Sequence, residues 1–283
     1  MRPESADKTK VSPLVMKLGF YRHLRAVVEF SQGWLGIPPD PLLPPQDLID
    51  QVGGGDFRQM GQQWLDHCAR VGGLQPHHRV LDVGCGCGRL AVPLMKYLSA
   101  KGGYWGFDII PRGIRWCRRH IRPKRWNFHF AVADLCNNCY RADGNIPAVE
   151  YRFPYRDSFF DLVVLASVFT HMQPPELNHY LSEIARVMKP GARCLLSFFL
   201  MNDQVRKSPQ SGALDFKFKL VDCYALREDI PEAAVAFDEE YVRRCLREHG
   251  LRVIEPIHLG CWCGRREFLD YQDIVLATKE PRR

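Results

Sequence analysis

Apolar and polar positions change their spacing repeatedly between residue 78 and the end of the chain. Short apolar runs alternate with segments in which apolar residues recur every three or four positions. The short runs are typical of buried strands, and the longer period is typical of amphipathic helices. Strands that alternate with helices build a parallel sheet, so the pattern predicts an α/β fold. The strands are expected at Arg79–Val83, Tyr104–Phe107, Phe128–Val132, Leu162–Leu165, Cys194–Phe198, Leu251–Glu255 and Tyr271–Thr278.

The helices between these strands are expected to cover both faces of the sheet. A proline followed by a glycine at Lys189-Pro190-Gly191 ends one helix and turns the chain into the next strand. Asp238 is a suitable N-cap for the last helix. The predicted helices are Arg89–Ala100, Arg112–Ile121, Pro175–Met188 and a final one that runs from Asp238 to His249.

The first 75 residues follow a different pattern, which predicts helices separated by loops. Val15–Phe30 and Phe57–Val71 have helical apolar spacing, and the five prolines of Ile37–Pro45 predict an extended linker between them. We therefore divide the chain into a helical cap or lid (1–75) and an α/β domain (76–283). The domain carries an insertion at 200–237, which we expect to form part of the lid or, alternatively, a protein interface.

A glycine loop joins the first strand to its helix in the sequence RVLDVGCGCGRLAVP, residues 79–93. Without side chains the chain can turn sharply and press its backbone against a ligand, and the helix start adds unpaired N–H groups. Gly86-x-Gly88-x-x-Ala91 also satisfies the dinucleotide fingerprint, which leaves an oxidoreductase as an alternative. Asp82 argues against it, because dinucleotide strands do not need an acid before the glycines.

The loop resembles motif I of the class I S-adenosylmethionine (SAM)-dependent methyltransferases, and further blocks follow in that family's order. The resemblance implies a seven-stranded sheet with an antiparallel last strand, and SAM as cofactor with S-adenosylhomocysteine as product. It also implies that Asp108 holds the ribose, Ile109 lies on the adenine and Asp134 accepts from the adenine amino group. The cofactor-binding residues expected from it are Asp82, Gly84, Cys85, Gly86, Gly88, Asp108, Ile109, Asp134, Leu135, Ala166 and Ser167. The alternatives are a helix N-cap for Asp108 and a loop cap for Asp134.

Methyl transfer to an alcohol needs a group that takes up a proton, and His171 after the fourth strand is the candidate base. Trp262 and Arg265 are candidates for holding the acceptor, because an indole stacks on sugar rings and a guanidinium binds carboxylate or phosphate. The alternatives are a capping or packing role for His171 and Trp262, and a local ion pair for Arg265. The expected acceptor is a small molecule, most plausibly an oxygen of a sugar or secondary metabolite.

The charge of the chain adds a second possible partner. The formal net charge is +7, and seven arginines and lysines lie between Arg112 and Arg125 without an acid. This stretch is either the solvated face of a helix, with Ile114, Cys117 and Ile121 turned inward, or a docking patch for an anionic partner. RNA or protein methylation and a non-catalytic SAM-binding scaffold therefore remain as alternative functions.

Eleven cysteines, an odd number, indicate reduced thiols and a cytoplasmic protein. Neither a secretory signal nor a membrane-spanning run is expected from the apolar pattern. Cys136, Cys139, Cys261 and Cys263 leave a four-thiolate zinc site as an alternative, although the second pair is closely spaced. We expect no catalytic metal, and the oligomeric state stays open.

Overall fold

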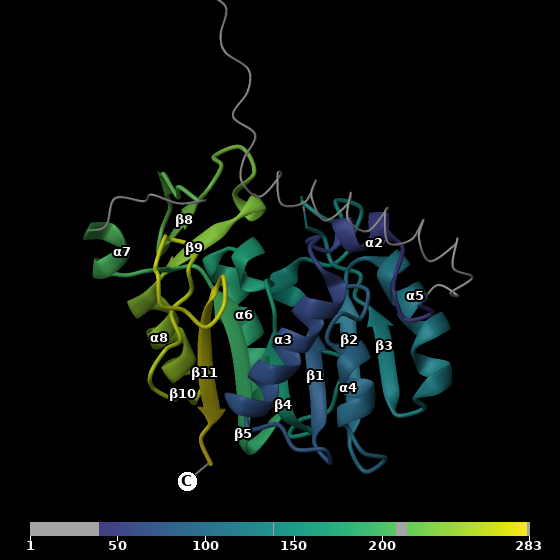
Figure 1. The fold of residues 1–283 in the computed structure, drawn as a ribbon. Coiled ribbons are helices and arrows are strands. Elements are labelled where there is room, and N and C mark those ends of the chain that lie inside the picture. The colour runs from purple at the N-terminus through teal and green to yellow at the C-terminus, as the bar shows by residue number, and fades with distance from the viewer. Residues whose placement is uncertain (1–39, 138, 208–213, 282–283) are drawn as a thin grey trace, which may run out of the picture.

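The computed structural model describes residues 40–137, 139–207 and 214–281. Its centre is a seven-stranded sheet in the order β10-β11-β5-β4-β1-β2-β3 (Figure 1). β11 runs antiparallel to both of its neighbours, and the other neighbouring pairs are parallel. The predicted fold class and the antiparallel last strand are confirmed. The strands are β1 (Arg79–Val83), β2 (Gly103–Asp108), β3 (Phe128–Val132), β4 (Phe160–Leu165), β5 (Met188–Phe198), β10 (Leu251–Val253) and β11 (Asp273–Lys279).

Helices cover both faces of the sheet, as predicted. One apolar cluster joins the sheet to α3 (Phe57–Arg70), α4 (Ala91–Tyr97) and α5 (Pro111–His120). The other cluster joins the opposite face to α6 (Pro174–Val187) and α8 (Glu239–Glu248). In Figure 1, α3 and α4 lie in front of the strands and α6 lies behind them.

The central strand β1 shows how the sequence creates two cores. Its residues from Val80 to Val83 are all buried, as expected of a parallel strand covered on both sides. Val80 belongs to the cluster under α3 and α4, whereas Leu81 and Val83 belong to the cluster under α6. Because side chains alternate along a strand, Asp82 lies on the same face as Val80.

The connection from β3 to β4 is irregular and includes one short 3-10 turn, η2 (Ala148–Glu150). Its first part is a loop that is closed by isolated bridges from Leu135 to Ile146 and from Asn137 to Arg141. We call residues 135–146 the roof loop, because its first residues lie over the cavity described below.

The predicted insertion forms a second, four-stranded sheet in the order β6-β9-β8-β7. Its strands are short, and an apolar cluster that contains Phe199, Phe216 and Trp262 lies beneath them. Figure 1 shows this sheet beyond one end of the main sheet, above β10 and β11. The additional elements are β6 (Leu200–Met201), α7 (Asp203–Lys207), β7 (Phe218–Lys219), β8 (Cys223–Ala225), η4 (Pro231–Ala233) and β9 (Val235–Asp238).

Two helices precede the main domain in the described part of the chain. The predicted helix at 57–71 is confirmed as α3, and α2 (Gln46–Gln51) was not predicted. The predicted helix at Val15–Phe30 lies outside the described residues. Among the described helices, none is both long and apolar enough to cross a membrane.

Candidate active site

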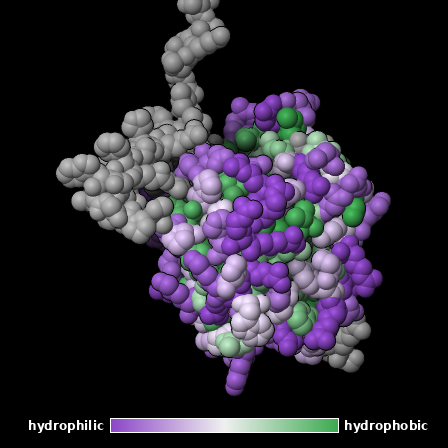
Figure 2. Space-filling view, turned by 90° about the vertical axis from the view of Figure 1, so that its right-hand side faces the viewer, coloured by the Kyte–Doolittle hydropathy of each residue, from purple (hydrophilic) through white to green (hydrophobic). Residues whose placement is uncertain are grey.

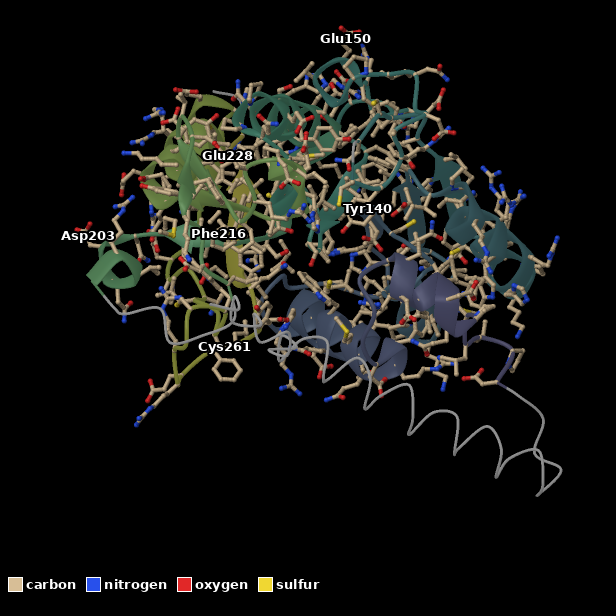
Figure 3. The ribbon with its side chains drawn as sticks, turned by 90° about the horizontal axis from the view of Figure 1, so that it is seen from above. Tyr140, Glu150, Asp203, Phe216, Glu228 and Cys261 are labelled. Atoms are coloured by element: carbon tan, nitrogen blue, oxygen red, sulfur yellow. The ribbon has the colours of Figure 1, made fainter. Side chains whose placement is uncertain are left out.

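A cavity of about 250 Å³ opens at the carboxyl ends of β1, β2 and β4. This is where α/β sheets bind ligands, because the strand order reverses beside the first strand. The glycine loop forms its floor and the roof loop covers it. Val52, directly after α2, and Met60 and Trp64 of α3 close one side. Figure 3 looks onto this end of the molecule, with Tyr140 toward the middle and Phe216 to one side.

The glycines of the loop have two different roles. Gly84 and Gly86 have positive φ angles of 76° and 55° and line the cavity. A Cβ on Gly84 would lie 2.4 Å from Val168, so the segment after β4 packs directly on the loop. A Cβ on Gly88 would lie 2.7 Å from Ile121 and 3.0 Å from Cys117. Gly88 does not line the cavity, so its role is close packing against α5 and the expectation of ligand contact is corrected.

Asp82 lies at the bottom of the cavity and is buried. Its Oδ2 accepts a hydrogen bond from the Tyr104 hydroxyl at 2.6 Å. Burial raises the pKa of Asp82 to about 7, although the bond from Tyr104 acts in the opposite direction. A buried carboxylate with a raised pKa is costly to ionise, so it is suited to binding a positively charged ligand group.

Asp108 closes β2 and also lines the cavity. Its Oδ2 accepts from the backbone N–H of Gly86 at 2.7 Å, and its Oδ1 accepts from that of Ile110 at 2.8 Å. Burial raises the pKa of this carboxyl. Each oxygen keeps a further lone pair, so Asp108 can shape the glycine loop and still accept from ligand hydroxyls.

Arg89, directly after the glycine loop, is a cavity residue that was not predicted. Its guanidinium donates to the Gly54 carbonyl at 2.5 Å, while its buried Nε has no partner among the described residues. Burial lowers the pKa of this guanidinium. Arg89 and Asp82 therefore present a cation and an anion to the same cavity.

Comparison with known proteins identifies this architecture. Residues 80–191 match the family model described as a methyltransferase domain. A solved SAM-dependent methyltransferase from Methanosarcina mazei superposes with a TM-score of 0.51 at 22% identity, covering 74% of this chain and 95% of that one. The chain therefore contains a methyltransferase domain at residues 80–191, in the fold of the SAM-dependent methyltransferases.

Curated relatives match this chain over about half of its length. A ubiquinone/menaquinone biosynthesis C-methyltransferase from Cupriavidus taiwanensis is 28% identical over 152 residues, which are 54% of each chain. The 27-O-demethylrifamycin SV methyltransferase of Amycolatopsis mediterranei is 29% identical over 174 residues, or 55% of each chain. The chain thus spans about half the length of the curated relatives that it matches.

SAM-dependent methyltransferases share this fold, and the cavity of this chain fits SAM. The amino-acid end of SAM carries an ammonium and a carboxylate. These groups match the buried Asp82 and the unpartnered Nε of Arg89, respectively. Gly84 and Gly86 line the cavity with backbone alone, and a Cβ on either glycine would press against Val168 or Val52 of the cavity wall. Of the other predicted cofactor residues, Cys85, Ile109, Leu135, Ala166 and Ser167 also line the cavity.

Ser167, two residues after β4, has a left-handed conformation with φ 60°, which is unusual for a residue other than glycine. Its N–H donates to the Ser197 hydroxyl at 2.8 Å. The hydroxyls of Ser167 and Ser197 both donate to Gln272 Oε1, at 3.1 and 2.6 Å. Gln272, which was not predicted as a site residue, therefore holds the end of β4 in place from the start of β11.

Asp134 was expected on the adenine but does not line the cavity. Arg141 and Asn145 each donate to one of its carboxylate oxygens at 2.6 Å. Arg141 also donates to the Ala133 carbonyl at 3.0 Å. Asp134 thus holds the base of the roof loop, and the loop-capping alternative is the one that this geometry favours.

His171 ends the short helix η3 (Phe169–His171) and lines the cavity together with Tyr140 of the roof loop. Its Nδ1 lies 2.9 Å from the Glu232 carbonyl oxygen, and its Nε2 lies 3.1 Å from the Tyr140 hydroxyl. Burial lowers the pKa of His171, which keeps the imidazole neutral near pH 7. His171 therefore lies at the cavity with a tyrosine hydroxyl on its second nitrogen, and its role as base stays a prediction.

Trp262 and Arg265 do not line the cavity. Trp262 is fully buried against Phe199 and Phe216, and its indole donates to Asp273 at 2.7 Å. Arg265 donates to the same carboxylate at 3.2 Å. Trp262 exposes no ring face to an acceptor, so the expected acceptor role is corrected to the alternative of core packing and a local ion pair.

The basic stretch forms α5 and the short helix η1 (Arg122–Lys124) that follows it. Ile114, Cys117 and Ile121 are buried, as predicted. Arg112 pairs with Asp47 at 2.5 Å. Exposed basic residues remain on this side of the molecule, next to Trp126, which is 74% exposed. Figure 2 shows that the same side of the molecule is largely hydrophilic.

The cysteines of the described residues are all free. In this part of the chain, no three His, Cys, Asp or Glu side chains are grouped as metal ligands. Cys136, Cys139, Cys261 and Cys263 therefore do not assemble the four-thiolate site that their spacing left open.

Proposed function

We propose that this methyltransferase transfers the methyl group of SAM to a hydroxyl oxygen of a small molecule. The observation that carries the proposal is a single cavity with two chemically distinct ends. One end offers Asp82 and Arg89 to a zwitterion, and the other offers His171 and Tyr140 to a group that loses a proton.

SAM brings a methyl group that is already activated on its positive sulfur. The chain's own contribution is then mainly to hold the acceptor close to the methyl and in line with the bond that breaks. Asp108 and the glycine loop would fix the nucleoside, and Ala166 and Ser167 would lie by the methionine part. A neutral His171 can take up the proton of an alcohol, which favours oxygen over a carbon acceptor.

The acceptor side is supported by the position of the insertion. The Glu232 carbonyl, in the turn η4 of the insertion, bonds to His171, so the insertion reaches the cavity wall. Apolar side chains of Met172 and Tyr180 line the same cavity. We propose that α2, α3 and the insertion form the lid over a small apolar acceptor, since excluding water protects the reaction.

The test uses SAM with an isotopically labelled methyl group, incubated with the protein and a small-molecule extract. Mass spectrometry is expected to find a product that is heavier by one labelled methyl, and the D82N variant is expected to form little of it. SAM binding without any transfer would instead favour a non-catalytic SAM-binding protein. Binding of reduced nicotinamide in place of SAM would favour an oxidoreductase.

RNA methylation is the second candidate, and the exposed face of α5 is the observation that favours it. Arg115, Arg119 and Arg122 are exposed there, close in sequence to the exposed Trp126. Filter binding of a transfer RNA at rising salt tests it, because phosphate contacts make affinity fall steeply with salt. R119E should weaken binding, whereas R247E on α8 serves as a control. No retention at low salt would remove this candidate.

A further inference from the structure

The hydrogen bonds of His171 assign its tautomer. A carbonyl oxygen accepts and never donates, so the contact of 2.9 Å to Glu232 requires a proton on Nδ1. In a neutral imidazole the other nitrogen then carries the lone pair. The Tyr140 hydroxyl, 3.1 Å from Nε2, must therefore be the donor in that bond.

This arrangement leaves His171 without an open basic nitrogen. Nδ1 is used by the insertion and Nε2 by Tyr140, whose ring meets the imidazole edge to face at 5.0 Å. An acceptor hydroxyl cannot reach the lone pair of Nε2 unless Tyr140 moves away. The Tyr140 oxygen, in contrast, keeps lone pairs of its own and belongs to a residue that lines the cavity.

Two contacts hold the backbone around this pair in place. Val168 packs against Gly84, and the His171 N–H donates to the Val168 carbonyl at 3.0 Å. On the other side, the Asn137 side chain donates to the His171 carbonyl at 3.4 Å, which ties the roof loop to the same turn. Tyr140 thus reaches from the roof loop after β3 to the segment after β4.

We propose that Tyr140 is the catalytic residue that contacts the acceptor hydroxyl, and that it passes the proton on to His171. In this step the acceptor's proton moves to the Tyr140 oxygen while the phenol's own proton moves to Nε2 of His171. The acceptor oxygen forms the new bond to the methyl carbon. The carbon–sulfur bond breaks, and its electron pair stays on sulfur. The imidazolium later returns its proton to water. This inference rests on the proposed function.

The protonation states needed at the start are those that the site favours. Burial raises the pKa of Tyr140 to about 12, so its hydroxyl is protonated near neutral pH. Burial keeps His171 neutral, ready to receive a proton. The Glu232 carbonyl then stabilises the imidazolium that forms, because its bond to Nδ1–H strengthens when the ring is charged.

The experiment compares Y140F, H171N and the double variant with the wild type. Y151F is the matched control, because Tyr151 is a neighbouring buried tyrosine that does not line the cavity. Labelled methyl transfer into a small-molecule extract is followed at saturating SAM, and SAM affinity is measured by calorimetry. Y140F and H171N should each lose on the order of 100-fold or more in rate, as expected for a lost proton acceptor, with unchanged SAM affinity. The double variant should be no slower than H171N, because the two residues act as one unit.

A spectroscopic readout separates this role from a structural one. Nitrogen-15 spectra of the histidine side chains, with H171N to assign the signal, should show the Nδ1–H tautomer. The Nε2 resonance should shift in Y140F and stay in place in Y151F. An Nε2–H tautomer, or full activity of Y140F, would contradict the proton relay from Tyr140 to His171 but leave the proposed function intact. A wild type that binds SAM but methylates nothing would overturn the proposed function together with the relay.

Discussion

Two buried aspartates, Asp82 and Asp273, look alike in sequence and differ in what surrounds them. Asp82 lies within β1 and Asp273 begins β11, and burial raises the pKa of both carboxyls. Asp273 accepts from four donors, the backbone N–H groups of Leu200 and Gly260 and the side chains of Trp262 and Arg265. Among the described residues, Asp82 accepts from Tyr104 alone and faces a cavity.

The comparison separates a structural carboxylate from a binding one. Four donors within the fold compensate the charge of Asp273. Through them Asp273 connects β11 to the small sheet and to the segment that holds Gly260, Trp262 and Arg265. In the part of the molecule that the structure describes, the charge of Asp82 has no cation bonded to it, so the group stays costly to ionise until a cationic ligand group pairs with it. A buried acid that lacks a partner and opens into a cavity is therefore the better indicator of function.

Replacing Asp273 should have the largest effect on stability. D273A leaves the Arg265 guanidinium and three further donors buried without their acceptor, which we expect to cost about 3–5 kcal/mol of unfolding free energy. Chemical denaturation measures it. The folded fraction should still bind SAM with wild-type affinity. A loss below about 1 kcal/mol would show that the four donors find other partners and that Asp273 is not the junction described.

Replacing Asp82 should have the opposite profile. D82N keeps the shape and removes a charge that is costly to bury, so the unfolding free energy should stay equal or rise. SAM affinity should fall by about 1.5–3 kcal/mol, the range for a hydrogen bond to a charged group. Calorimetry with SAM measures the affinity, and S-adenosylhomocysteine should show the same loss. Unchanged binding would contradict the contrast between the two aspartates.

Asp108 lies between these extremes, because it has backbone partners and also lines the cavity. D108A should weaken SAM binding by about 1–3 kcal/mol, since ribose hydroxyls lose a buried acceptor. It should also lower stability slightly through the lost bonds to Gly86 and Ile110. A SAM analogue without the ribose hydroxyls should bind the variant and the wild type more nearly alike. An equal loss for both ligands would assign Asp108 to loop shape alone.

The features that could be predicted from the sequence are those determined by neighbouring residues. Features determined by contacts between distant segments could not be predicted. The strand, the glycine turn and the helix after it are determined by neighbouring residues, so β1, the loop and the position of Asp82 were predictable. Asp134 and Trp262 were assigned to ligands because their types suit that role. Their actual partners, Arg141 and Asp273, are determined by the way loops close and by contacts between distant segments.

The strands of the predicted insertion and the role of Tyr140 were missed for related reasons. Strands as short as β6 and β7, of two residues each, carry too little apolar alternation to be recognised. Tyr140 is 31 residues from His171 and belongs to an irregular loop without a motif. The sequence identified the histidine after the fourth strand, but only the fold shows which side chain covers its basic nitrogen.

Trp262 tests the structural side of the comparison with a smaller change. W262F removes the indole N–H from Asp273 and leaves the other three donors in place, so we expect a loss of about 1–2 kcal/mol in unfolding free energy. The Michaelis constant for the methyl acceptor should not change, because the ring is buried away from the cavity. A raised Michaelis constant without loss of stability would restore Trp262 as an acceptor residue.

The pH dependence of SAM binding should show the smallest effect and separate the two carboxylates directly. We expect Asp82 to pair with the ammonium of SAM as a carboxylate, whereas in the free protein its pKa of about 7 keeps it protonated below neutral pH. Affinity should therefore weaken by about tenfold between pH 8 and pH 6, and binding below pH 7 should release a proton.

For folding, the pH dependence of the Asp82 contribution has the opposite sign. Between about pH 4 and pH 7 the folded chain keeps a proton that the unfolded chain has lost, so this group's contribution to stability falls as pH rises. Calorimetry in buffers of different ionisation enthalpy measures the released proton. D82N should abolish both dependences, whereas W262F, which alters only the surroundings of Asp273, should leave them intact. A dependence that persists in D82N would transfer the titration to another group of the cavity, with Asp108 the next to test.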